Sequence, residues 1–280
     1  MTKDKVLVVT GGSKGIGFEI AVAALKVGYK VAATSRNGEA LADKIVALVP
    51  EKKDQFLSLT MAFDETSIQT AMSEVVATFG QINVLVNNAG YALLGAVEEV
   101  SMAGVRANFD VNVFGLLQVT QAVLPYMREK RSGHMINLAS ISGTVTGPTQ
   151  GIYSATKAAV IMMSEALSDE VAPLGIQVTA ICPGGIRTDF LDKSSLKKPA
   201  HAIKDYEIVH ETLAQLDRLN HNQSGDPKKV ALAILEVADM AQAPKRLYLN
   251  RSAVAGVRAK ALSVLSEVED HLDLSLSTDS

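Results

Sequence analysis

The stretch that decides the fold lies near the start of the chain and reads Val6-Leu7-Val8-Val9-Thr10-Gly11-Gly12-Ser13-Lys14-Gly15-Ile16-Gly17. A short apolar run leads directly into a glycine-rich turn, and a helical pattern follows over residues 15–28. A strand, a glycine-rich turn and a helix in this order are typical of the first unit of an open parallel sheet. The alternative interpretation is a tight turn between strand and helix with no further role.

The rest of the chain repeats this alternation of short apolar runs and amphipathic stretches. The predicted strands are 5–10, 30–34, 55–59, 82–86, 133–139, 175–181 and 246–249, and the predicted helices are 15–28, 37–48, 65–79, 102–130, 151–173 and 226–240. The strands are apolar throughout rather than alternating, as expected when helices cover both faces of a parallel sheet. Right-handed crossovers then predict an α/β fold: one doubly wound Rossmann domain with about seven parallel strands.

Two segments depart from the alternation. Residues 184–225 form a long excursion between a strand and a helix, with a charged helical stretch at 203–219, and a connection of this length predicts a substrate-binding lid. We therefore expect a catalytic domain over residues 1–250, followed by a C-terminal extension over 251–280. Within the extension, 251–269 is predicted to be an amphipathic helix and Asp270–Ser280 a disordered polar tail.

Composition excludes several classes of protein. The 280 residues are 48% hydrophobic and carry a net charge of −3, so no basic excess points to nucleic acid or to an anionic membrane. The single cysteine, Cys182, excludes an internal disulfide framework. No signal-like segment and no apolar run of ~20 residues occurs, so we expect a cytoplasmic protein. The five histidines show no ligand spacing, and no metal is expected.

A phenol and an ammonium lie four positions apart in the predicted helix 151–173, as Tyr153 and Lys157. Residues at i and i+4 share one face of a helix. A free phenol titrates near ~10, and lowering that pKa by about three units requires roughly 4 kcal/mol. One fixed positive charge at ~4 Å supplies about this much at an effective dielectric near 20. The pair is thus a candidate general acid/base for an alcohol oxygen, and the alternative is a solvated surface pair.

The glycine turn is a candidate phosphate-binding site. Glycines at 11, 15 and 17 allow a tight turn and a close approach of backbone to a pyrophosphate at the helix N-terminus.

The end of the second predicted strand bears on the type of dinucleotide. An acidic residue at this point would bind the ribose hydroxyls and repel a 2′-phosphate. The sequence instead has Ser35 and Arg36, with Lys14 in the glycine turn that should face them. Two cations and a hydroxyl around one ribose predict NADP(H), with NAD(H) less favoured.

With these motifs, the chain resembles the short-chain dehydrogenase/reductase family over almost its whole length to about residue 250. It is most similar to bacterial oxidoreductases related to 17β-hydroxysteroid and retinol dehydrogenases. The signals that carry the resemblance, in the family's order, are the glycine run, Asp64, Asn87-Asn88-Ala89-Gly90, Ser140, the Tyr153 and Lys157 pair, and Pro183-Gly184-Gly185-Ile186-Arg187-Thr188.

The resemblance implies a catalytic set of Asn112, Ser140, Tyr153 and Lys157. Ser140 precedes Tyr153 by the family's usual thirteen positions (153 − 140 = 13) and would hydrogen-bond the substrate oxygen. Lys157 would lower the pKa of Tyr153 and bind the nicotinamide ribose. Asn112 would hold a water that relays protons towards the lysine.

The resemblance also implies the cofactor contacts. Asp64 would bind the adenine amino group, and Thr188 with the Ile186 backbone would clamp the nicotinamide carboxamide. The full implied set is Gly11, Ser13, Lys14, Gly15, Ile16, Gly17, Ser35, Arg36, Asp64, Asn88, Ala89, Gly90, Tyr153, Lys157, Pro183, Gly184, Ile186 and Thr188.

The expected substrate site lies between Ser140, Tyr153 and the lid. Its candidate lining residues are Ser140, Ser142, Gly147, Thr149, Tyr153, Gly185 and Phe190. Since these residues are mostly small or apolar, we expect a ketone or aldehyde with a hydrophobic portion rather than a phosphorylated one.

The implied activity is reversible hydride transfer between nicotinamide and a carbonyl or secondary alcohol. Because NADP(H) pools are held reduced in most cells, the reductase direction is favoured. Two alternatives remain open: a non-catalytic NADP-binding sensor or regulator on the same fold, and an epimerase or dehydratase of related chemistry. In the family the helices corresponding to 102–130 and 151–173 form a subunit interface, so a homodimer or homotetramer is expected.

Overall fold

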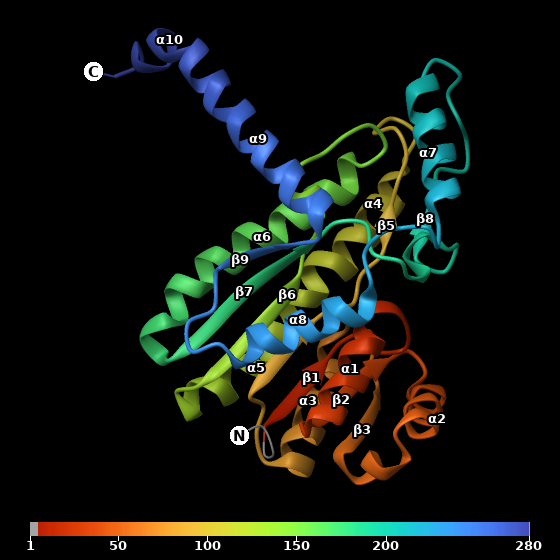
Figure 1. Cartoon of the computed structure of the whole chain (residues 1–280), viewed down its shortest axis with the longest axis vertical. Coiled ribbons are helices and arrows are strands. Elements are labelled where there is room, and N and C mark those ends of the chain that lie inside the picture. Colours follow the sequence, from red (N-terminus) through yellow and green to blue (C-terminus); the bar gives the residue numbers. More distant parts are fainter. Residues whose placement is uncertain (1–4, 280) are drawn as a thin grey trace.

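The computed structural model describes residues 5–279 and is built around a parallel sheet in the order β3-β2-β1-β4-β6-β7-β9 (Figure 1). Its strands are β1 (Val6–Val9), β2 (Lys30–Ser35), β3 (Phe56–Thr60), β4 (Val84–Asn87), β6 (Gly133–Leu138), β7 (Ile176–Pro183) and β9 (Arg246–Leu249). A second, two-stranded parallel sheet pairs β5 (Ala92–Leu93) with β8 (Leu196–Lys197).

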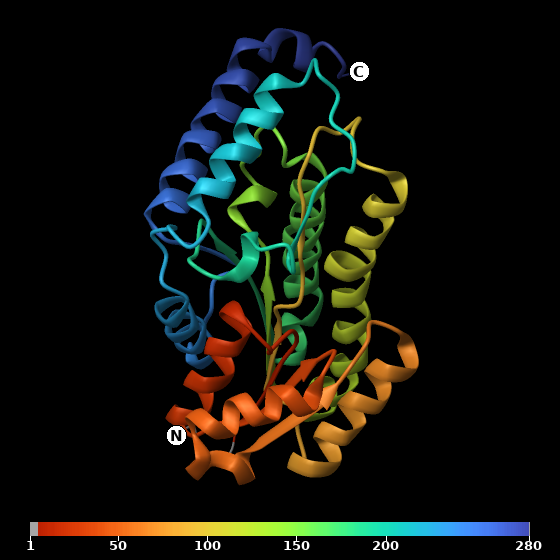
Figure 2. The same cartoon turned by 90° about the vertical axis from the view of Figure 1, so that its right-hand side faces the viewer.

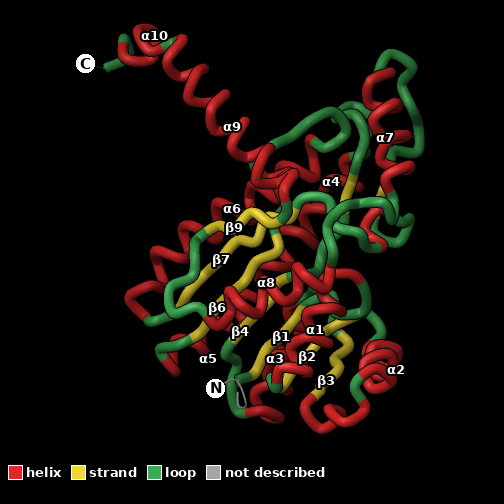
Figure 3. Tube along the Cα trace, in the orientation of Figure 1, coloured by secondary structure: helices red, strands yellow, loops and turns green. Residues whose placement is uncertain are grey.

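Helices cover both faces of the large sheet, as the tube trace shows (Figure 3). They are α1 (Gly15–Val27), α2 (Gly38–Leu48), α3 (Glu65–Phe79), α4 (Met102–Phe109), α5 (Leu116–Lys130), α6 (Gly151–Val171), α7 (Glu207–Leu219), α8 (Pro227–Asp239), α9 (Arg251–Asp270) and α10 (Leu272–Leu276). The buried cluster on one face takes its helical residues from α1, α2 and α8. On the other face they come from α3, α5 and α6.

The first strand shows why the apolar runs are uninterrupted. Successive side chains of a strand point to opposite faces. Accordingly, Leu7 and Val9 lie in the cluster beneath α1 and α8, and Val6 and Val8 lie in the cluster beneath α3 and α5. Since all four are fully buried, a polar side chain at any of these positions would lie against a helix.

The strand order places a topological switch between β1 and β4. The chain runs outward from β1 to β3 and then returns to place β4 on the other side of β1. The loops that follow β1 and β4 therefore leave the sheet in opposite directions at its carboxyl edge. Crevices at such points are the usual ligand sites of open α/β sheets.

The predicted seven-stranded doubly wound fold is confirmed, and the predicted strands and helices occur with ends shifted by a few residues. The single long helix expected over 102–130 is wrong in its middle. There α4 and α5 are joined by a π-helical segment, Asp110–Gly115, which contains Asn112. The two-residue strands β5 and β8 are too short to leave a pattern in the sequence.

The long excursion 184–225, which was predicted to be a substrate-binding lid and is called the lid from here on, is ordered. It leaves the body at Ile186 and returns to it at Gly225, where these two residues form a bridge. Between these points, β8 pairs with β5 and α7 stands away from the sheet (Figure 1). The lid is thus fixed at its base and at one strand.

The C-terminal extension is helical over Arg251–Asp270 and Leu272–Leu276, so most of the tail that was expected to be disordered is ordered among the described residues. After α9, the expected disordered tail forms α10, and the hydroxyls of Ser277 and Thr278 donate to the carbonyls of Leu274 and Ser275. Residues 1–4 and 280, which belong to the expected N-terminal region and tail, lie outside the described residues. Within residues 5–279, no helix combines the length and apolar character needed to cross a membrane.

Candidate active site

The glycine turn after β1 has no room for a side chain at Gly11 or Gly17. Gly11 adopts a φ of +69°, in the left-handed region that favours glycine. A Cβ on Gly17 would lie 2.3 Å from Asn88 Nδ2 and 2.6 Å from the Gly11 carbonyl oxygen. The first turn of α1 therefore packs directly against the loop that follows β4.

Hydrogen bonds lock these two loops together. The Thr10 hydroxyl oxygen accepts from the backbone N–H groups of Asn88 (3.0 Å) and Ala89 (3.1 Å). In return, Asn88 Nδ2 donates to the carbonyls of Thr10 (2.9 Å) and Gly11 (3.1 Å). Asn88 and Ala89, expected to contact the cofactor, thus shape the turn that would cradle it.

The N-terminus of α1 fits an anion. Its cap residue, Lys14, makes no side-chain capping hydrogen bond, and its first turn carries no acidic residue among the described positions. Backbone N–H groups at such an end are free to bind phosphate, and the helix dipole adds to the attraction. Together with the glycine cradle, this end fits a dinucleotide pyrophosphate.

The segment after β7 closes over the turn. A Cβ on Gly15 would lie 3.6 Å from the Cβ of Thr188. Thr188 is fixed in turn because its hydroxyl oxygen accepts from the Phe190 backbone N–H at 3.3 Å. Ile186 is 7% exposed and packs into the core. The structure thereby brings together the two segments that sequence predicted to hold opposite ends of the cofactor.

Two cations, Lys14 in the glycine turn and Arg36 after β2, are the pair expected to face one ribose. Burial is the main cause that lowers the pKa of Lys14, the carboxylates of Asp189 and Asp192 oppose this shift, and the charge of Arg36 adds to it. Arg36 is exposed. The third member of the expected set, Ser35, is already engaged: its hydroxyl donates to the Asn37 carbonyl (2.6 Å) and accepts from the Asn37 N–H (3.1 Å).

Several other expected cofactor residues have structural roles here. Asp64 is exposed and caps α3, accepting from the Ser67 N–H at 2.9 Å. Gly184 follows the last residue of β7, Pro183, and lies so close to Asn250 that a Cβ would meet its Oδ1 at 2.5 Å. Ile16 is partly buried against the core, and Ser13 is half-buried in the turn.

Asn112 joins three parts of the site from its place in the π-helical segment. Its Oδ1 accepts from the Tyr91 N–H (3.0 Å), and its Nδ2 donates to the Tyr91 carbonyl (2.9 Å) and the Thr156 hydroxyl (3.1 Å). The side chain is 1% exposed. Because both ends of the carboxamide bind protein groups, Asn112 fixes the loop after β4 against α6.

Lys157 lies buried at the centre of the site. It is 5% exposed, and its Nζ donates to the Leu138 carbonyl at 2.7 Å. Burial lowers its pKa to about 8. A Cβ on Gly90 would lie 2.9 Å from Asn112 Oδ1 and 3.6 Å from Lys157 Nζ, so only a glycine fits between these groups and the loop.

Tyr153 lies on the same face of α6, and its ring centroid is 5.9 Å from Lys157 Nζ. The two residues are both buried, which excludes the solvated surface pair. The expected lowering of the Tyr153 pKa is not found in the protein alone. Burial raises the pKa of the phenol, and the hydrogen bond with Ser140 offsets only part of this rise. Desolvation of the phenolate therefore exceeds the effect of the neighbouring polar groups.

The lid supplies an apolar wall beside the phenol. The rings of Tyr153 and Phe190 lie with centroids 5.9 Å apart. Sequence reasoning found Phe190 but missed the aliphatic residues of the same cluster, which are Ala92, Leu94, Leu191, Leu196, Leu213 and Leu216. The amphipathic pattern of α7 was the available signal for the last two.

The remaining expected substrate residues differ in their placement. Ser142 donates its hydroxyl proton to Gln150 Oε1 at 2.8 Å. Thr149 is 4% exposed with a φ of +77°, and among residues 5–279 its buried hydroxyl has no hydrogen-bond partner. Gly147 and Gly185 are exposed, and no described atom lies within 4 Å of a Cβ built on Gly147.

A buried carboxylate that the sequence did not reveal anchors the lid. The side chain of Glu99 is 1% exposed and accepts from the backbone N–H groups of Ile203 (2.7 Å) and Ala96 (3.2 Å). His210 on α7 lies 2.8 Å from the same carboxylate. The Ile203 hydrogen bond contributes most to lowering the pKa of Glu99.

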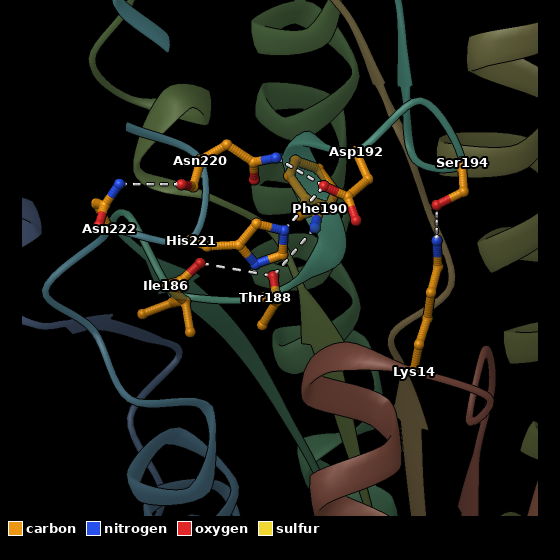
Figure 4. A network of polar contacts seen from close by, with 9 residues as sticks. All are labelled: Lys14, Ile186, Thr188, Phe190, Asp192, Ser194, Asn220, His221 and Asn222. Carbon is orange, nitrogen blue, oxygen red and sulfur yellow. Dashed lines mark hydrogen bonds and ion pairs between the residues drawn. The ribbon is translucent and has the colours of Figure 1, made fainter. Parts of the chain in front are cut away.

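A second set of polar contacts lies near the glycine turn (Figure 4). Lys14 Nζ donates to the Ser194 hydroxyl at 2.6 Å. Asp192 accepts from Asn220 at 2.6 Å, lies 3.1 Å from His221 Nε2, and has its pKa lowered chiefly by the Asn220 hydrogen bond. The side-chain oxygens of Asp189 and Asp192 and a ring nitrogen of His221 lie within 4.8 Å of one another, as the ligands of a metal ion would. The hydrogen bonds of Asp192 with Asn220 and His221 explain this grouping without a metal, because they hold the lid together.

Comparison with known proteins places this geometry in a family. The short chain dehydrogenase family matches residues 5–199. Oxidoreductase BOA17 of Botryotinia fuckeliana is 34% identical over 272 residues, covering 96% of this chain and 98% of the relative. The 3-ketodihydrosphingosine reductase of Bacteroides thetaiotaomicron is 31% identical over 242 residues, covering 86% of each chain.

Solved structures of short-chain dehydrogenases are similar to this chain over most of its length. A short-chain dehydrogenase from Streptomyces avermitilis is similar with a TM-score of 0.89 and 37% identity, covering 98% of both chains. The structure of ElxO with NADP bound has a TM-score of 0.76 and 26% identity, covering 90% of this chain and 99% of the other. The protein belongs to the short-chain dehydrogenase/reductase family of oxidoreductases.

The close approach of Gly17 to Asn88 can be tested by Gly17→Ala. An alanine inside a helix ordinarily stabilises by about 1 kcal/mol relative to glycine. Here its Cβ would push Asn88 from the two carbonyls it binds, so we expect a net loss of about 1–3 kcal/mol in the free energy of unfolding. Urea denaturation measures it, with Gly147→Ala as the control in open space. A Gly17→Ala protein as stable as the wild type contradicts the packing.

Proposed function

We propose that this protein is an NADP(H)-dependent oxidoreductase that transfers hydride between nicotinamide and a carbonyl or secondary alcohol, and that it works as a ketone or aldehyde reductase. The observation that carries the proposal is the buried Tyr153 phenol, hydrogen-bonded to Ser140 and lying beside the buried Lys157 ammonium. Membership of an oxidoreductase family supports it.

The protonation of Tyr153 favours the reducing direction. Burial raises the pKa of Tyr153, so the phenol carries its proton at neutral pH. The alkoxide produced when a carbonyl is reduced is a stronger base than a phenolate, and the proton therefore moves downhill from Tyr153 Oη to the substrate oxygen. The Ser140 hydroxyl donates a second hydrogen bond to that oxygen.

Lys157 stabilises the phenolate that this step leaves. Its ammonium lies 5.9 Å from the phenol ring in a site from which water is largely excluded, where an opposite charge acts more strongly than in solution. Because burial lowers the pKa of Lys157 to about 8, the group can also release a proton near neutral pH. Asn112 acts in this scheme by holding the loop after β4 against α6.

The cofactor fit rests on chain residues. Gly11, Gly17 and the uncapped N-terminus of α1 would hold the pyrophosphate, and Thr188 would hold the nicotinamide end. When bound, the nicotinamide supplies the hydride. Lys14 and Arg36 would bind a 2′-phosphate, and the structurally similar ElxO has NADP bound.

The substrate class follows from the wall around Tyr153. Phe190 and the aliphatic cluster of β5, β8 and α7 favour a substrate with a hydrophobic portion next to its carbonyl. A relative that carries the name 3-ketodihydrosphingosine reductase supports a ketone.

Replacing Tyr153 by Phe tests the proposed activity. Wild-type protein should oxidise NADPH stoichiometrically with at least one member of a panel of ketones, aldehydes, steroids and quinones. Tyr153→Phe should lower turnover by a factor on the order of 10²–10⁴ because the proton donor is lost. NADPH affinity, measured by calorimetry, should be nearly unchanged. Tyr126→Phe on α5 is the matched control.

The same assay separates the alternatives. NADPH binding without turnover on any carbonyl would favour a sensor or regulator. Substrate conversion without net NADPH consumption would favour an epimerase or dehydratase. Near-normal turnover by Tyr153→Phe would remove the assigned role of the phenol.

Replacing Arg36 by Asp tests the cofactor preference. The exposed guanidinium would be replaced by a carboxylate that repels a 2′-phosphate and can accept hydrogen bonds from ribose hydroxyls. We expect the ratio of kcat/KM for NADPH to that for NADH to fall by roughly a hundredfold. Lys44→Asp, an exposed site on α2, is the control, and an unchanged ratio in Arg36→Asp refutes the assignment.

A further inference from the structure

Helix α9 leaves the body of the protein as an arm. Its root is anchored, because Asn250 caps it by accepting from the Ala253 N–H at 3.0 Å and Ala253 is fully buried. A Cβ on Gly256 would lie 3.9 Å from the Ile141 side chain, so the helix contacts the body at this point. Beyond the root, residues 261–279 are all exposed, and the two views show the arm extending away from the sheet (Figures 1 and 2).

One side of this arm is apolar. At 100° per residue, a single stripe along α9 is formed by Val254, Val257, Ala261, Val264, Leu265 and Val268. Leu265 is 57% exposed and Val268 is 49% exposed. None of the stripe belongs to the hydrophobic clusters of the described body.

A partner for this stripe is needed on energetic grounds. Most of the stability of a helix in a protein comes from packing its apolar side, and isolated helices are marginal in water. Each large aliphatic side chain left in water forgoes about 1.5–3 kcal/mol of burial. An arm ~30 Å long with its apolar side exposed is therefore a docking surface.

The charge pattern indicates what covers it. The first half of the arm carries Arg251, Arg258 and Lys260, and the second half carries Glu267, Glu269 and Asp270. Two copies of the arm side by side in antiparallel orientation place the basic half of each against the acidic half of the other. A parallel pair would place like charges together. A helix that lies on a membrane carries cations along its polar side, whereas the outer half of this arm is acidic.

Charged residues along one edge of the apolar stripe define how two antiparallel arms would pair. Arg258 and Glu269 project on the same side of it, at about 40° and 60° from Val254. They are eleven positions apart (269 − 258 = 11), too far to contact each other within one helix. In an antiparallel pair, residues on the same flank face each other across the interface.

We propose that α9 docks on α9 of a second copy of this chain as an antiparallel helix pair with its two-fold axis near Val264. The stripes of the two arms pack together, and Arg258 of each copy pairs with Glu269 of the other. This interface is separate from the side of the π-helical segment, α5 and α6 on which a subunit contact was expected, where Phe114 and Met162 are exposed. It is also independent of the proposed activity.

Charge exchange tests the proposal. Sedimentation velocity over a concentration series should show that Arg258→Glu and Glu269→Lys each raise the dissociation constant of one association step roughly tenfold. The double variant Arg258→Glu/Glu269→Lys should restore it. The control is Glu267→Lys, which makes the same charge change on the opposite side of the helix. Single variants without effect, or a double variant that is no better than the singles, would overturn the antiparallel pair.

A cysteine placed near the axis gives a second readout. The chain has one cysteine, Cys182, which is buried and does not compete. Leu265→Cys should form a disulfide-linked dimer under mild oxidation, whereas Ser263→Cys on the outer side should not. Equal cross-linking of both, a wild-type monomer at tens of micromolar, or a monomer recovered on anionic vesicles would each show that a second copy is not the occupant.

Discussion

The interaction on which the site depends is the hydrogen bond from the buried Lys157 ammonium to the Leu138 carbonyl. A buried cation is costly unless it is paired, and among residues 5–279 no salt bridge involves this one. The bond ties α6 to the end of β6. It therefore fixes the position of Tyr153, one helical turn before Lys157, relative to Ser140. The cost of burial appears as the lowered pKa of Lys157.

Two other constraints bring the opposite half of the site to the same point. The Thr10 and Asn88 hydrogen bonds join the loops after β1 and β4, and the Asn112 carboxamide joins the second of these loops to α6. Gly90 lies where these two connections meet. A shift of any one loop would therefore change the distance between the glycine cradle and the pair of Tyr153 and Lys157, although these residues are far apart in the sequence.

Sequence indicated the parts that repeat a local pattern. The apolar strands and the glycine turn follow from periodicity and backbone sterics, and the positions of Tyr153 and Lys157 follow from helical spacing. The remaining features depend on contacts between distant segments. Glu99 anchors the lid through Ile203 and His210. Whether the pKa of Tyr153 is raised or lowered depends on how deeply the phenol is buried. The π-helical turn at Asn112 and the two-residue strands leave no periodic signal.

The most direct test of the central claim is the pH dependence of the free energy of unfolding, compared between wild type and Lys157→Met. The pKa of Lys157 is about 8 in the folded protein, against 10.5 for the ordinary group. Between these values the unfolded chain binds the extra proton, so stability rises with pH. We expect the difference in the free energy of unfolding between wild type and Lys157→Met to shift in favour of wild type as the pH rises. The shift is up to about 1.4 kcal/mol per pH unit between pH 8 and 10.5. A difference that stays constant over this range would show that the ammonium is not desolvated, and would contradict the account.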